Sequence, residues 1–170
     1  MEYVALNLYQ ELRARGHDVR VAAAHAASAV EDEASIARAP RKGVPAYVLF
    51  ALTQGGAWVR SWRPDAILCG SIVSGPAGWI LSRVFRIPWV ALAHGSDILH
   101  PGWLYQRATR FLFKRAEALC ANSAQTRQLL IDAGMKPERI TVIHPGVRAS
   151  QFHPAPERKG EGAYAGRRVL

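Results

Sequence analysis

The 170-residue sequence is 49% hydrophobic and 21% charged, an ordinary globular composition that allows one sizeable core. It contains no apolar run long enough to cross a bilayer, and the charges within its first periodic segment do not fit a signal peptide, so we expect a cytosolic protein. The net charge of +9 indicates an anionic partner, such as phosphates or an anionic membrane surface. Nucleic acid is the weakest candidate, and we expect none as a partner, because the sequence has no zinc-finger spacing, single-stranded RNA motif or continuous basic region.

The first part of the chain predicts a helix followed by strands and a second helix. Apolar residues at helical spacing predict a helix over residues 2–15 that stops at Gly16, and the apolar run from Val19 predicts a short buried strand. We expect a loop with one helical turn over residues 26–43, a strand over 44–50 and a helix over 51–62. The run Ala66–Cys69 predicts another buried strand.

The second part continues the alternation. It predicts a helix through residues 79–84, a strand over 89–93, a long helix from Pro101 to about 117, a strand over 118–121, a helix over 125–133 that stops at Gly134, and a strand over 140–143. Strands that alternate with helices predict an α/β fold, with a Rossmann-like parallel sheet and flanking helices. From Pro154 the composition turns polar and rich in Pro and Gly, which is typical of a linker.

The segment VALAHGSDI, residues 90–98, is the best candidate for a reacting centre. A buried strand there opens into His94, Gly95, Ser96 and Asp97, and ligands bind beyond the carboxyl ends of parallel strands. The alternative is an ordinary loop in which Asp97 or Ser96 caps a helix and His94 bonds to a backbone carbonyl. A metal site of His94, Asp97 and His100 would need a helical loop, which Gly95 and Pro101 disfavour, so we expect no metal.

The helix predicted from Pro101 has an unusual surface, because no acidic residue lies between positions 101 and 115. Helical spacing predicts a core stripe of Tyr105, Ala108, Leu112, Ala116 and Leu119. The opposite face carries Arg107, Arg110 and Lys114 beside Trp103, with Phe111 and Phe113 flanking it. Such a face is typical either of an interfacial helix on anionic lipid or of a solvated surface.

Cys69 and Cys120 lie far apart at the ends of apolar runs, which predicts buried free thiols.

An ordered series of short segments carries a family resemblance. They are Glu2 with the helix that leads to Gly16-His17-Asp18-Val19, Arg63-Pro64-Asp65, His94-Gly95-Ser96-Asp97, Ala121-Asn122-Ser123, and Ile140 to Val147 followed by Phe152 and Pro154. The series resembles the N-terminal domain of a GT-B glycosyltransferase of the retaining family 4 type. The resemblance implies a Rossmann-like acceptor-side domain over residues 1–154, with a linker and the start of a second, donor-binding domain over 155–170.

The activity implied by the resemblance is hexosyl transfer, with retention, from a nucleotide-sugar donor to the hydroxyl of a sugar or a lipid-linked acceptor, without a cofactor or an obligatory metal. His94 would contact the transferred sugar, and the backbone of Gly95 and Gly146 would line the cleft. Asp97 would orient the acceptor or cap the next helix, and Ser123 would face the cleft or serve as an N-cap. The family often has an aspartate where this chain has Arg148, which weakens any acceptor contact expected there.

The resemblance also implies a fragment truncated at both ends. The family's first strand and its glycine-rich loop would directly precede Glu2, and most of the donor site lies in the second domain, so we expect the chain alone to be inactive. Loss of a central strand would leave backbone groups unpaired at about 1–3 kcal/mol each. We therefore expect the isolated chain to fold poorly or to close its sheet differently.

Two other functions fit parts of the sequence. One is a non-catalytic α/β binding module that docks on an anionic surface through the basic helix, which would make the protein peripheral on the inner face of a membrane. The other is a nucleotide-binding oxidoreductase. It is disfavoured because the one formal dinucleotide fingerprint, residues 160–165, neither follows a predicted strand nor opens a helix.

Overall fold

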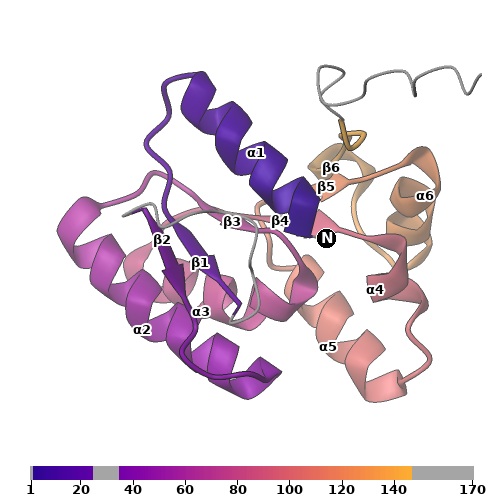
Figure 1. The fold of residues 1–170 in the computed structure, drawn as a ribbon. Helices are drawn as coiled ribbons and strands as arrows, with labels where there is room; N and C mark the ends of the chain where they lie inside the picture. The colour runs from indigo at the N-terminus through magenta and orange to yellow at the C-terminus, as the bar shows by residue number, and fades with distance from the viewer. Residues whose placement is uncertain (1, 25–34, 147–170) are drawn as a thin grey trace, which may run out of the picture.

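The computed structural model describes residues 2–24 and 35–146, and helices alternate with strands through both ranges (Figure 1). The elements before the site are α1 (Glu2–Ala14), β1 (Val21–Ala23), β2 (Ile36–Arg38), α2 (Val44–Trp62), β3 (Ile67–Cys69), the 3-10 turn η1 (Ile72–Ser74) and α3 (Gly75–Phe85). Those that follow are β4 (Trp89–Ala93), α4 (Gly95–Leu99), α5 (Trp103–Phe113), β5 (Ala118–Ala121), α6 (Ala124–Asp132), the 3-10 turn η2 (Pro137–Arg139) and β6 (Ile140–Val142).

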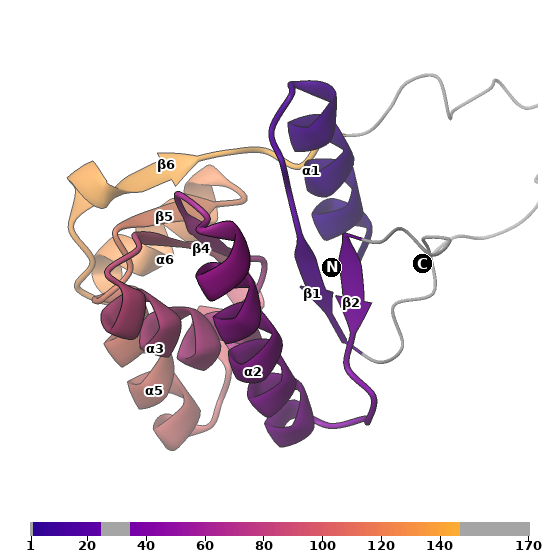
Figure 2. The same cartoon turned by 90° about the vertical axis from the view of Figure 1, so that its left-hand side faces the viewer.

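All paired strands among the described residues are parallel, which confirms the predicted α/β class. One sheet has the order β3-β4-β5-β6, and β1 and β2 form a separate pair. Figure 2 shows that this pair and α1 stand beside the four-stranded unit. In the larger sheet Ala91 lies opposite both Cys69 and Leu119, so the three strands are in close register.

The core lies against one face of the four-stranded sheet. Along β4 the residues alternate between buried and half-buried, with Trp89, Ala91 and Ala93 on the buried face. Phe113 of α5 and Leu130 of α6 join these residues in a single cluster. Small strand residues allow the helices to approach closely, and helix packing then buries the larger side chains at high density.

Two predictions in the first part of the chain are wrong. Residues 44–50 form the beginning of α2 and not a strand, because an apolar run can belong to either element and this one continues without a turn into a helix. Pro45 fits there because the first helical turn needs no backbone donor from it. Residues 36–38, predicted as loop, form β2, because parallel pairing with β1 supplies backbone hydrogen bonds that no local pattern announces.

The region after β4 also departs from prediction. The segment expected to be a non-helical loop contains α4, and the helix expected to begin at Pro101 begins at Trp103 and ends at Phe113. Pro101 lies between α4 and α5, where its missing donor interrupts no helical hydrogen bond. The core stripe of α5 is also shifted, since Ala108 is exposed whereas Phe113, expected at the flank, is buried.

Candidate functional site

The carboxyl ends of β3, β4 and β5 lie side by side at one edge of the sheet. Cys69, the last residue of β3, pairs with Ala91, and Ala93, the last residue of β4, pairs with Ala121 at the end of β5. The residues that follow these strands therefore converge at the edge where parallel sheets bind ligands.

His94 leaves β4 at the centre of this edge and is half-buried. Its Nε2 lies 3.1 Å from the carbonyl oxygen of Gly70, the residue that follows β3. Because a carbonyl oxygen only accepts, this hydrogen bond requires the hydrogen on Nε2, which leaves Nδ1 of a neutral ring as the acceptor. The His94 side chain also accepts from the Asp97 backbone N–H in the capping box of α4. A hydrogen bond from His94 to a backbone carbonyl is what we expect if this segment is an ordinary loop. The same bond also holds the ring in a defined tautomer.

Asp97 is buried, with 6% of its surface exposed, and closes the turn that follows His94. Its Oδ2 accepts a hydrogen bond from the His94 backbone N–H at 3.2 Å, and its side chain also interacts electrostatically with Tyr105. Burial raises the pKa of the Asp97 carboxyl, and the His94 N–H opposes this by lowering it. In this geometry Asp97 fixes the backbone of His94 and caps α4.

Ser123 and its neighbours build the adjoining corner. Ser123 is the N-cap of α6, and its Oγ accepts from the Thr126 backbone N–H at 3.1 Å. Thr126, which is buried, donates its hydroxyl hydrogen to Asn122 Oδ1 at 2.6 Å. A Cβ built on Gly95 would lie 3.5 Å from Thr126 Oγ1, so the beginnings of α4 and α6 meet beside His94.

Gly146 is the member of the predicted set that follows the last strand. It lies beyond β6, the outer strand of the sheet, it is exposed, and a Cβ built on it would have no atom within 4 Å. Arg148 lies outside the described residues.

Sequence reasoning missed Gly70 and Thr126. Gly70 directly follows a predicted strand, so its place at this edge could have been inferred.

The segment after His94 is helical despite Gly95 and Pro101, so the prediction of a non-helical loop that would keep His94, Asp97 and His100 apart is wrong. The histidine rings nevertheless have separate partners: His94 contacts Gly70, whereas His100 Nδ1 accepts from the Gly102 backbone N–H at 3.1 Å. Within residues 2–24 and 35–146, no three His, Cys, Asp or Glu side chains are grouped so that they could hold a metal ion.

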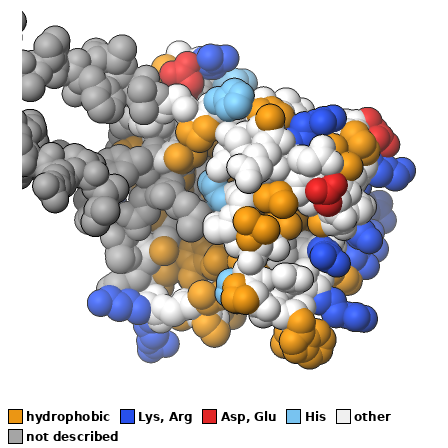
Figure 3. Space-filling model, turned by 90° about the vertical axis from the view of Figure 1, so that its right-hand side faces the viewer, with side chains coloured by type: hydrophobic (Ala, Val, Ile, Leu, Met, Phe, Trp, Pro, Cys, Tyr) orange, Lys and Arg blue, Asp and Glu red, His pale blue; other side chains and the backbone are white. Residues whose placement is uncertain are grey.

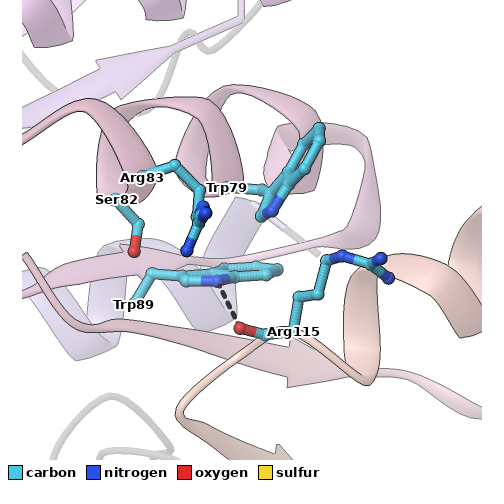
Figure 4. A pocket seen from close by; sticks show the side chains of 5 residues that line it. All are labelled: Trp79, Ser82, Arg83, Trp89 and Arg115. Carbon is cyan, nitrogen blue, oxygen red and sulfur yellow. Dashed lines mark hydrogen bonds between the residues drawn. The ribbon is translucent and has the colours of Figure 1, made fainter. Parts of the chain in front are cut away.

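Two hollows lie away from this edge. The first, of about 420 Å³, is lined by Trp79, Ser82, Arg83, Trp89 and Arg115, and Trp89 Nε1 donates to the Arg115 carbonyl at 3.0 Å (Figure 4). It lies at the amino end of β4, opposite to His94. The second, of about 490 Å³, lies along α5 and is lined by the four residues that the sequence singled out as a basic and aromatic face. Neither hollow includes His94.

The sequence of the chain is similar to those of glycosyltransferases over most of its length. The family model of Glycosyltransferase Family 4 matches residues 1–151. A D-inositol 3-phosphate glycosyltransferase of Streptomyces bingchenggensis is 31% identical over 134 residues, which cover 69% of this chain and 29% of that protein. The chain thus spans less than a third of the length of this relative.

Solved structures share the fold. The Anabaena HepE protein in complex with UDP superposes with a TM-score of 0.56 at 22% identity, over 71% of this chain and 33% of that one. A UDP-N-acetylglucosamine 2-epimerase from Rickettsia bellii superposes with a TM-score of 0.52 at 13% identity, over 67% of this chain and 31% of the other. These likenesses confirm the Rossmann-like arrangement, and the family match over residues 1–151 shows that the chain belongs to Glycosyltransferase Family 4.

Proposed function

We propose that this chain is the acceptor-side part of an enzyme that transfers a hexose, with retention, from a nucleotide-sugar donor to the hydroxyl of a sugar or lipid-linked acceptor. The observation that carries the proposal is the position of His94 at the carboxyl end of β4, between the ends of β3 and β5, in a member of a glycosyltransferase family. The Anabaena neighbour was solved with UDP and with UDP-glucose, which supports a nucleotide-sugar donor.

His94 acts in this proposal as a hydrogen-bonding group for the transferred sugar. The Gly70 carbonyl and the capping box of α4 hold the His94 ring in one orientation, in which it contacts the transferred sugar, and Asp97 keeps the backbone of His94 in place. The backbone of Gly95 and Gly146 lines the cleft. Stabilisation of the departing diphosphate comes from groups outside this chain, in a second domain of the enzyme, without a cofactor or an obligatory metal.

The test is a donor-hydrolysis assay with a panel of nucleotide sugars, on the protein expressed from its complete coding sequence. We expect turnover of one donor, and a decrease in kcat/KM of at least about 100-fold in His94→Ala, the usual range for a lost group that acts on the reacting atoms. His100→Ala is the matched control, because that histidine is exposed and its ring contacts Gly102 and Tyr105 and no described residue at the strand ends, and it should stay within about twofold of wild type.

Two further outcomes decide the finer points of the proposal. NMR of the product should show the anomeric configuration of the donor, and an inverted product would contradict retention. Activity should survive a chelator. If the protein neither hydrolyses nor binds any donor, a non-catalytic module that docks on an anionic surface becomes the better explanation.

A further inference from the structure

A cationic and aromatic surface on α5 has no part in the site around His94. Trp103, Arg107, Arg110 and Lys114 line the second hollow, and all four are exposed. At about 100° per residue, their positions fall within an arc of roughly 60° around the helix axis. Of the buried residues of the same helix, Leu112 lies on the opposite side and Phe113 lies on the flank. We call the four residues the α5 face.

Large apolar side chains are exposed beside the basic ones. Trp103 is 73% exposed, Leu104 65%, and Leu99, the last residue of α4, 62%. Leu99 precedes the short connection between α4 and α5, and Trp103 and Leu104 follow it. The two helices contact each other. Large exposed apolar side chains that gather beside charged ones are typical of an interaction surface.

The cationic surface continues past α5 toward α3. Arg115 lines both hollows, and its guanidinium lies 3.4 Å from the centroid of the Phe111 ring while Nη1 donates to the Phe111 carbonyl at 3.1 Å. Arg83 lines the first hollow from α3 (Figure 4).

No acidic side chain lines either hollow, and the one acidic residue between positions 75 and 116 is the buried Asp97. In Figure 3, which shows the side of the molecule with α4 and α6, Lys and Arg side chains gather along one edge, with Asp and Glu side chains beside some of them. The linings of the two hollows therefore carry charge of one sign, which attracts an anionic partner.

We propose that the α5 face docks the protein on a membrane of anionic phospholipids, with α5 lying along the interface. Cations attract both lipid headgroups and nucleic acid, but the exposed Leu99 and Leu104 cannot stack on bases or bond to their edges, whereas they gain by leaving water for the acyl boundary. Trp103 is the side chain that best fits the headgroup level of a bilayer. In the part of the chain that the structure describes, no helix is long and apolar enough to span a membrane, so contact would be along the surface. This proposal does not depend on sugar transfer.

The test is co-sedimentation of the protein, expressed from its complete coding sequence, with phosphatidylcholine vesicles that contain or lack about one third phosphatidylglycerol. Each basic residue near an anionic surface contributes roughly fivefold to binding, so the triple variant Arg107→Gln, Arg110→Gln, Lys114→Gln should bind on the order of 100-fold more weakly. The matched control is Arg41→Gln, Lys42→Gln, Lys136→Gln, which removes the same charge at exposed residues outside both hollows. It should bind within about threefold of wild type.

A second variant separates insertion from simple charge attraction. Leu104→Ser with Trp103→Ser keeps every cation, and we expect binding to fall at least about tenfold at all salt concentrations. Far-ultraviolet circular dichroism of each variant shows whether it is folded. The proposal is overturned if the α5 triple variant and its control bind equally well, or if wild type does not distinguish the two vesicles. It is also overturned in favour of nucleic acid if a single-stranded oligonucleotide binds more tightly than the vesicles and the Ser variant binds them as wild type does.

Discussion

Two substitutions at Asp97 should have different effects on stability. Asp97→Ala removes the acceptor of the His94 backbone N–H, and a buried donor left unpaired costs about 1–3 kcal/mol. It also removes the contact to Tyr105, but it relieves the cost of a buried charge, so we expect a loss of about 1–3 kcal/mol in the free energy of unfolding. Asp97→Asn keeps an oxygen for the His94 N–H and discards the charge. Because burial raises the pKa of Asp97, the charge is a cost, and this variant should be as stable as wild type at neutral pH or more stable.

The pH dependence gives the sharper measurement. The pKa of Asp97 is higher in the folded chain than in the unfolded one, so the folded chain binds more protons between the two values. The contribution of Asp97 to the free energy of unfolding therefore increases as the pH falls through the folded pKa, and it levels off below the unfolded value of about 3.9.

Urea unfolding of wild type and Asp97→Asn across this range isolates the effect, since all other groups cancel in the difference. Wild type should gain stability relative to the variant as the pH falls. A raised pKa of Asp97 is contradicted if the difference stays flat or has the opposite sign. A cost of the buried charge is contradicted if Asp97→Asn loses as much stability at neutral pH as Asp97→Ala.

Three further predictions concern packing, capping and thiol reactivity. Gly78→Ala should lower the free energy of unfolding by about 1–3 kcal/mol in urea titrations, because its Cβ would overlap Cys69 Sγ and crowd Trp89; unchanged stability would show that α3 can shift. Ser123→Ala should cost about 1 kcal/mol by removing the N-cap of α6, and Ser123→Asp should restore most of it; equal losses in both would contradict a capping role. Burial raises the pKa of Cys69 to about 11 and also raises the pKa of Cys120, which is less buried. A thiol reagent at pH 8 should therefore modify Cys120 before Cys69, and it should modify both faster in urea. Faster reaction of Cys69 in the native protein would contradict its burial.

Local patterns were sufficient for much of the fold. The strand bounds predicted for residues 89–93 and 118–121 are those of β4 and β5, and Gly16 and Gly134 follow the ends of their helices with φ near +86°. Continuous apolar runs between turn residues identify buried parallel strands, and glycine adopts a positive φ at little cost. The place of His94 at the end of a strand follows from the same reasoning.

The sequence by itself determined the parallel α/β class, the family, the strand from which His94 emerges and the basic face of α5. The tertiary structure decided that residues 44–50 are helical and that residues 36–38 form a strand, since packing on α3 and pairing with β1 come from distant parts of the chain. It also decided that His94 bonds to Gly70 and that Asp97 is buried. These contacts join elements whose relative positions depend on sheet register and core packing, and no local pattern of residues encodes those.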